Sequence, residues 1–332
     1  MTAELPGGGT LKLDGQAGPI NPADAALTPA QTKITVSAFN LAESGLIDPA
    51  MGISGIADLD GTATSDGKEA KIDGTLKASN LKVSAKGTPA EKPVQIAFAI
   101  VDDLTKQTGA IHQCDVAMGK AVAHLTGTFD THAAVTVVNL KLNGDNMPVD
   151  DLEAMLPAVG VILPPKATLK GGDLNVNMDS AGAVDKLVTT GTVKLQNTEL
   201  TNFDLGSRLS AISALAGKQT GNVTTIQNFS SDVHVAPEGT AANNINLNVP
   251  SLGVVTGAGT VSPSNELAFK MSAAVAGLTV PFGVSGTTSD PKFTPDVKGM
   301  ATGMLKNLLG NKNSQNQQNP LNTLQGLFKK KQ

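Results

Sequence analysis

The sequence VQIAFAI, from Val94 to Ile100, decides the fold, because large apolar side chains at every second position alternate with small or polar ones. A β-strand with one apolar face has this period of two. LAFKMSAAV, from Leu267 to Val275, repeats the pattern, and LTVPFGV, from Leu278 to Val284, resumes it after a short break. The last two runs predict a β-hairpin.

Strand patterns of this kind occur along most of the chain. Further runs are Ile34 to Phe39, Ile72 to Val83, Val135 to Leu142, Leu174 to Met178, Val193 to Leu200, Val233 to Val235 and Ile245 to Val249. The 332 residues include 40% hydrophobic and only 16% charged side chains, with no Trp and no Tyr. This composition favours many short strands over a helical bundle and predicts a mainly β protein of more than ten strands, with almost purely aliphatic apolar surfaces.

A Gly-Thr dipeptide recurs in or beside these runs. It occurs at Gly61-Thr62, Gly74-Thr75, Gly127-Thr128, Gly191-Thr192, Gly259-Thr260 and Gly286-Thr287. The spacing is too uneven for a fixed-period solenoid. We interpret the dipeptides as turn residues, and the alternative is that they bend strands so that the sheet curls.

Three segments have the periodicity of helices. They are Pro148 to Val159, Asp204 to Ala216 and Pro295 to Gly310, followed by a polar linker and an amphipathic end. Pro157 is expected to keep the first helix short. The sequence thus divides into a β-rich region at 1–146, a second β region with short helices at 147–294, and an amphipathic helical tail at 295–332.

Several classes of function lack the residues that they need. The net charge of -4 and a single arginine, Arg208, argue against nucleic acid as a partner. His112 and Cys114 at strand spacing, with His124 on a neighbouring strand, form the best candidate for a metal site, but the paired ligands of known zinc signatures are missing. The carboxylate pairs Asp58/Asp60, Asp102/Asp103 and Asp150/Asp151 lack the aromatic platforms of a sugar cleft. We expect no catalytic site, no metal and no cofactor.

The chain resembles the C-terminal region of the AsmA family of Gram-negative envelope proteins. The resemblance rests on segments of the second half that occur in the same order as in that family. They are LEAMLPAVGVILPPKATLKGGDLNVNM (Leu152 to Met178), TGTVKLQNTELTNFDLGSRLSAISALAG (Thr190 to Gly217), the Thr225-Ile226 strand start, the Gly257-Ala258-Gly259-Thr260 turn and VSGTTSDPKFTPD (Val284 to Asp296). GPINPADAALTP (Gly18 to Pro29) and GISGIADLDGTATSDG (Gly52 to Gly67) are also similar to family sequence.

This resemblance implies a long, curled antiparallel sheet with an aliphatic groove, related in design to bridge-like lipid-transfer proteins. It also implies a non-enzymatic role in phospholipid transport to the outer membrane, or in protein assembly and targeting there. The expected location is the periplasm, with an inner-membrane anchor in a segment missing from this chain. The implied partners are a phospholipid or other acyl lipid and a membrane surface.

Two sets of residues are the candidate sites. The groove candidates are Val94, Ile96, Phe98, Ile100, Leu267, Phe269, Met271, Leu278, Val280, Phe282 and Val284. The membrane-surface candidates are Leu321, Leu324, Leu327, Phe328, Lys329, Lys330 and Lys331. The alternative for this tail is a frayed, solvent-exposed chain end. The alternation alone favours a sandwich or closed barrel, and the family resemblance reverses this preference. A structural or adhesive cell-surface protein with a closed core and no ligand is therefore the alternative function.

Overall fold

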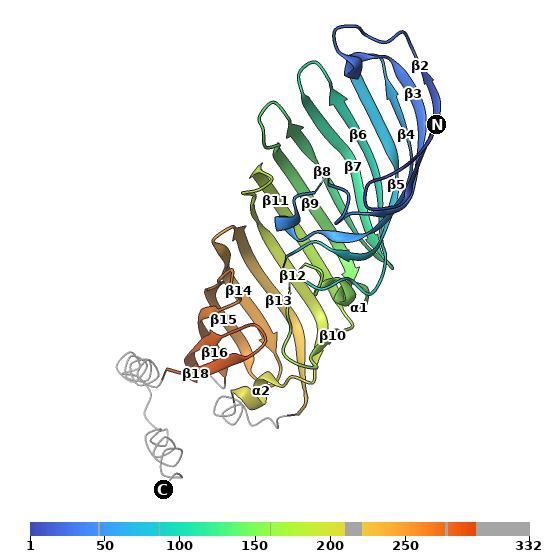
Figure 1. The fold of residues 1–332 in the computed structure, drawn as a ribbon. Coiled ribbons are helices and arrows are strands. Elements are labelled where there is room, and N and C mark those ends of the chain that lie inside the picture. Colours follow the sequence, from blue (N-terminus) through green and yellow to red (C-terminus); the bar gives the residue numbers. More distant parts are fainter. Residues whose placement is uncertain (46, 86, 160, 210–220, 276–277, 297–332) are drawn as a thin grey trace, which may run out of the picture. The chain divides into compact units, whose positions relative to one another are not determined.

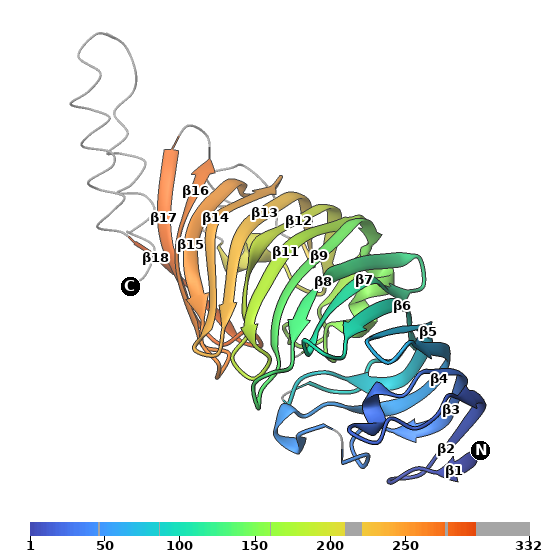
Figure 2. The ribbon, with the colours of Figure 1, turned by 90° about the horizontal axis from the view of Figure 1, so that it is seen from above.

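The computed structural model describes residues 1–296, except 46, 86, 160, 210–220 and 276–277. Met1–Pro295 form one compact unit. Figures 1 and 2 show this unit as a single row of strands that curls along its length. The expectation of a mainly β protein built on a long curled antiparallel sheet is confirmed.

The sheet has 18 strands. Those of the first half are β1 (Thr2–Glu4), β2 (Thr10–Ala17), β3 (Ala30–Asn40), β4 (Ser54–Ser65), β5 (Glu69–Lys82), β6 (Val94–Asp103), β7 (Thr108–Met118), β8 (Ala121–Asp130) and β9 (Val137–Pro148). Those of the second half are β10 (Thr168–Lys170), β11 (Asp173–Ala183), β12 (Val188–Thr201), β13 (Val223–Ala236), β14 (Gly239–Val249), β15 (Gly253–Val261), β16 (Leu267–Val275), β17 (Leu278–Gly286) and β18 (Pro291–Pro295).

Almost every strand is antiparallel to the next strand along the chain. The exception is β10, which pairs with the end of β12 and not with its neighbours along the chain. In the sheet, β11 lies between β9 and β12. The predicted hairpin of β16 and β17 is present, with Met271 opposite Phe282. Among the described residues no register joins β1 to β18, and the sheet is not closed. The sandwich and the closed barrel are therefore wrong as architectures for this part of the chain.

The two long edges of the sheet differ. Short hairpin turns such as those at 104–107 and 184–187 line one edge, which we call the turn edge. Most of the longer connections, together with the short turns at 119–120 and 250–252, line the other, which we call the helix edge. It carries α1 (Val149–Leu152), the 3-10 helix η3 (Glu153–Met155) and α2 (Leu205–Arg208); two more 3-10 turns are η1 (Ala25–Leu27) and η2 (Pro49–Met51).

Strand residues other than glycine with a positive backbone φ lie toward the helix edge. Backbone φ is positive at Ala38 in β3, Asn80 in β5, Asn146 in β9, Asn197 in β12 and Asn244 in β14. These strands all run in the same direction, because neighbours are antiparallel, and each ends at the helix edge. Asparagine tolerates this left-handed conformation better than most residues, and a β-bulge bends its strand. The aligned irregularities are consistent with the curl of the sheet.

The Gly-Thr dipeptides correct one sequence interpretation. All but the last lie inside strands, in β4, β5, β8, β12 and β15, and Gly286 ends β17. The interpretation as turn residues is therefore wrong for most of them. At Gly127 and Gly191 a Cβ would overlap the backbone of the neighbouring strand, so glycine fits these positions inside the sheet.

The helices are shorter than predicted. α1 and η3 occupy only the first part of Pro148 to Val159, and the helical conformation stops before Pro157. α2 begins after Asp204, whose carboxylate accepts a hydrogen bond from the Gly206 N–H at 2.9 Å. Pro295 belongs to β18 and not to a helix; residues 210–216 and 297–310 of the other predicted helices lie outside the described residues. Of the described helices, none has the length and apolarity needed to cross a membrane.

Candidate functional site

The groove candidates of β6 lie on one face of the sheet with apolar neighbours on both sides. Ile100 is directly opposite Ile72 of β5 and Ile111 of β7. Ile96 is opposite Leu76 and Val116 in the same two strands. Because direct partners in an antiparallel pair share a face, these side chains form one apolar surface.

This surface continues to the candidates of β16 and β17. From Ile111 the row of direct partners runs through Gly127, Leu140, Ser180, Thr189, Val235, Thr240 and Val261 to Leu267. Phe269 is opposite Val284, and Leu278 is opposite Val275. The structure therefore brings both groups of candidates onto one face, which we call the aliphatic face.

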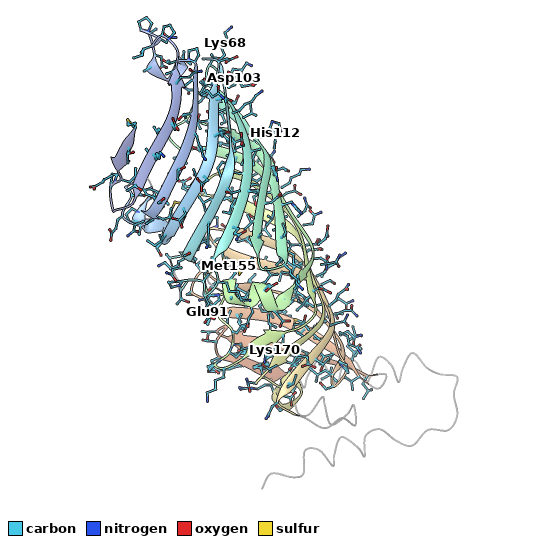
Figure 3. All side chains as sticks on the ribbon, turned by 90° about the vertical axis from the view of Figure 1, so that its right-hand side faces the viewer. Lys68, Glu91, Asp103, His112, Met155 and Lys170 are labelled. Atoms are coloured by element: carbon cyan, nitrogen blue, oxygen red, sulfur yellow. The ribbon has the colours of Figure 1, made fainter. Side chains whose placement is uncertain are left out.

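The aliphatic face is covered at the helix edge and partly exposed elsewhere. Val94 is 1% exposed in a cluster with Ala78, Leu81 and Met118, against which Met155 of η3 packs. Figure 3 shows Met155 at this end of the strands, with Lys68 and Asp103 at the opposite end. Away from the helix edge, Ile72 is 37% exposed and Val235 is 42% exposed. Val280 and Phe282 are buried, while the remaining groove candidates are half-buried.

The other face of the sheet is mainly polar, although it also carries exposed valines such as Val137 and Val254. Thr35 donates a hydrogen bond to Asp60 at 3.0 Å, and Thr62 donates one to Asp73 at the same distance. Asp58 accepts a hydrogen bond from the Ala38 N–H at 2.8 Å. Asp58 and Asp60 thus lie inside β4 and bond within the sheet. The two faces differ in chemistry as the alternation predicts.

Glycines of the aliphatic face make room for larger neighbours. A Cβ at Gly109 would overlap the ring of Phe129, and a Cβ at Gly191 would lie 2.7 Å from the sulfur of Met178. Real Cβ atoms do not come so close to a neighbouring side chain. These glycines are therefore part of the packing of the sheet surface.

The Asp150/Asp151 pair fixes α1 to two different turns. Asp150 accepts a hydrogen bond from the Gly171 N–H at 3.0 Å. Asp151 accepts one from the Lys120 N–H at 2.8 Å, and the ammonium of Lys92 lies 3.2 Å away. The hydrogen bond from Lys120, followed by the one from Lys92, lowers the pKa of Asp151. The two carboxylates therefore have separate structural roles, and nothing in their geometry places them as an acid–base pair.

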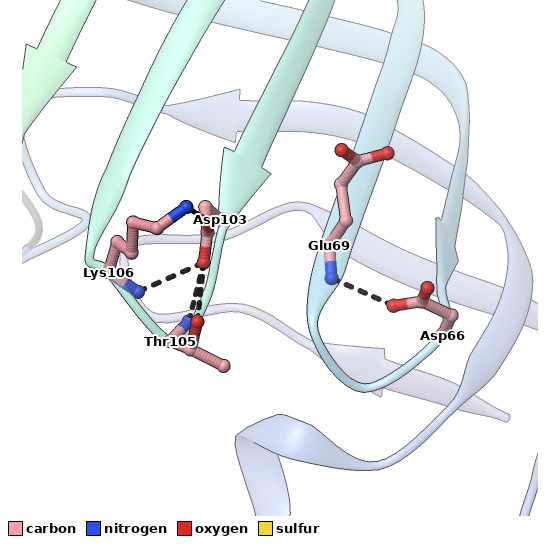
Figure 4. Close-up of polar contacts among 5 residues, drawn as sticks. All are labelled: Asp66, Glu69, Asp103, Thr105 and Lys106. Carbon is pink, nitrogen blue, oxygen red and sulfur yellow. Dashed lines mark hydrogen bonds and ion pairs between the residues drawn. The ribbon is translucent and has the colours of Figure 1, made fainter.

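Carboxylates at the turn edge have a similar role. Asp103 accepts hydrogen bonds from the Thr105 hydroxyl at 2.7 Å and from the Lys106 ammonium at 2.8 Å. Asp66 accepts bonds from backbone N–H groups, including that of Glu69 at 2.8 Å (Figure 4). Lys106 is the main cause of the lowered pKa of Asp103. These aspartates close the turns of the β4–β5 and β6–β7 hairpins.

The residues weighed as metal ligands do not meet. Cys114 is directly opposite Phe98, and burial raises the pKa of its thiol. A β-bulge shifts the register between Cys114 and Ile111 in β7. His112, inside this bulge, lines a hollow of about 450 Å³ with Val101 and other polar-face residues. The His124 Nδ1 lies 2.6 Å from a carboxylate oxygen of Asp115. Within the described residues, no three His, Cys, Asp or Glu side chains are grouped so that they could hold a metal ion.

The predicted site and the described site differ in two sets of residues. The membrane-surface candidates Leu321 to Lys331 are outside the described residues. Leu125 opposite Leu142, and Phe129 opposite Val138, belong to the aliphatic face but were not among the candidates. Their signal was present, because Leu125, Gly127 and Phe129 alternate with polar residues. The glycine in the middle of this run made the strand pattern difficult to recognise.

Comparisons of the chain with protein-family models, curated proteins and solved structures gave no match. The function must therefore be argued from the aliphatic face and from the residues at its edges.

Proposed function

We propose that this chain is a non-enzymatic protein of the Gram-negative envelope that shields the acyl chains of phospholipids on its aliphatic face. Its role is in phospholipid transport to the outer membrane, or in protein assembly and targeting there. The observation that carries the proposal is the continuous aliphatic face, which is partly exposed away from the helix edge. Soluble domains rarely leave a contiguous apolar surface open unless it binds something.

Acyl chains match the chemistry of this face. Most of its large side chains are aliphatic or phenylalanine, although Ser180, Thr189 and Thr240 interrupt the row described above. The register continues from strand to strand without a second sheet above it among the described residues. A chain of about sixteen carbons gains on the order of 10 kcal/mol gross when about 0.8 kcal/mol is assigned to each buried methylene. An acyl chain that moves between equivalent apolar positions on the face does not return to water. No nucleophile or metal is needed for such movement.

The resemblance to the AsmA family supports the envelope as the location. The alternative, a structural or adhesive protein without a ligand, requires the apolar faces to be closed. The open single sheet gives that alternative no second layer in the described part of the chain. Lipid shielding is therefore the better-supported function.

The test is binding of a fluorescent phospholipid by the purified chain, together with mass spectrometry of co-purified lipid. Phe98→Glu places a carboxylate on the aliphatic face of β6, and Gln95→Glu places one on the polar face of the same strand. We expect Phe98→Glu to reduce uptake at least about fivefold, because a charge is costly to bury beside an acyl chain. Gln95→Glu is expected to leave uptake unchanged. Absence of co-purified lipid and of uptake by the unmodified chain would refute the proposal.

A further inference from the structure

One carboxylate stands on the aliphatic face at the turn edge. Asp102 follows Ile100 by two residues in β6 and is directly opposite Ala70 and Gly109, so it shares the face of Ile100. Its Oδ1 atom is buried and has no hydrogen-bond partner among the described residues. A buried carboxylate oxygen without a partner is costly, and in a native structure it calls for an explanation.

The charged neighbours of Asp102 are already engaged. Asp103 pairs with Lys106 at 2.8 Å, Glu69 with Lys71 at 3.1 Å and Asp130 with His132 at 2.9 Å. In the described part of the chain, neither Asp102 nor Lys68 takes part in an ion pair. The Lys68 carbonyl accepts a hydrogen bond from the Leu104 N–H at 2.8 Å, so Lys68 lies beside the residue that follows Asp103.

Lys68 and Asp102 therefore flank the end of the aliphatic face. Lys68 precedes Ala70, the direct partner of Asp102, by two residues and is exposed. Figure 3 shows Lys68 at the same end of the strands as Asp103. An anion on the face and a cation at its rim, next to Ile72 and Ile100, fit a lipid headgroup that carries both charges.

We propose that Asp102 and Lys68 bind the headgroup of a zwitterionic phospholipid with a primary ammonium, such as phosphoethanolamine. The ammonium pairs with the Asp102 carboxylate, which is half-buried as a residue although its Oδ1 atom is covered. The Lys68 ammonium contacts the phosphate. The acyl chain then starts at Ile100, Ile72 and Ile111 and lies on the aliphatic face. This inference rests on the proposed function and adds a headgroup preference to it.

The experiment compares two lysolipids with the same acyl chain, lysophosphatidylethanolamine and lysophosphatidylglycerol, below the concentrations at which they form micelles. Each displaces a fluorescent fatty acid from the purified full chain. A charge-assisted hydrogen bond implies that the ethanolamine lipid binds at least about fivefold more tightly to the unmodified chain. Free phosphoethanolamine is expected not to compete, because the acyl chain supplies most of the affinity.

Asp102→Asn is expected to abolish the preference while the glycerol lipid binds as well as before or better. The matched control is Asp14→Asn, which removes one carboxylate from the polar face of β2. Lys68→Gln is expected to weaken both lysolipids equally relative to a monoacylglycerol, and it tests the site independently if Asp102→Asn fails to fold. Equal affinity of the unmodified chain for both lysolipids, or a preference that survives Asp102→Asn, overturns the headgroup site but leaves the proposed function standing. Absence of binding by either lysolipid contradicts the proposed function itself.

Discussion

The same substitution at two positions of the aliphatic face tests whether the face is covered at one end and open elsewhere. Val94→Thr and Val235→Thr both replace a methyl with a hydroxyl of similar size. Val94 is 1% exposed among apolar side chains, whereas Val235 is 42% exposed. The substitution at Val94 loses about 0.8 kcal/mol of methyl burial and adds about 1–2 kcal/mol for a hydroxyl removed from water. We therefore expect a loss of about 2 kcal/mol at Val94 and less than about 0.5 kcal/mol at Val235.

The assay is urea unfolding followed by circular dichroism, because the chain has no Trp and no Tyr to report by fluorescence. A lower midpoint with an unchanged slope shows lost stability rather than a changed unfolded state. Equal losses at the two positions would show that Val235 is covered as well, and the open face would be wrong. No loss at Val94 would show that the cluster under η3 is not packed.

Three further substitutions test how the sheet is built. Asp151→Asn is expected to destabilise the chain near neutral pH. The hydrogen bond from the Lys120 N–H is the main cause of the lowered pKa of Asp151. The carboxylate therefore stabilises the fold above its unfolded pKa, and this stabilisation is lost as pH falls through its folded pKa. The stability difference between Asp151→Asn and the unmodified chain should disappear in urea unfolding at strongly acidic pH. Gly109→Ala is expected to cost about 1–3 kcal/mol through overlap with Phe129, and pairing it with Phe129→Ala should recover part of that loss in a double-mutant cycle. Asn146→Val is expected to lower the free energy of unfolding by about 1–2 kcal/mol, because φ is +49° at this position. Asn146→Gly should not lower it, and equal effects would show that the backbone at Asn146 is not strained.

The sequence predicts the strands better than it predicts how they combine. Alternation correctly places Val94 to Ile100 and the hairpin of Leu267 to Val284, since a period of two is a local property. It does not show that Ile100 and Leu267 belong to one row, because that depends on the register of every strand between them.

The errors have physical causes in particular residues. Gly61 and Gly127 resemble turn residues in the sequence but lie inside strands. The bulge beside Ile111 separates His112 from Cys114, and two-residue spacing alone does not reveal it. The unpartnered oxygen of Asp102 could not be predicted, because burial and hydrogen bonding depend on the neighbouring strands in the folded sheet.

Photo-crosslinking tests the central claim most directly. A phospholipid with a photoreactive acyl chain is bound to the purified chain and irradiated, and the modified residues are mapped by mass spectrometry. We predict that modification concentrates on the aliphatic face, at residues such as Phe98 and Met271, and spares Gln95 and Lys270 on the polar face of the same strands. Modification spread equally over both faces, or none at all, would contradict the account.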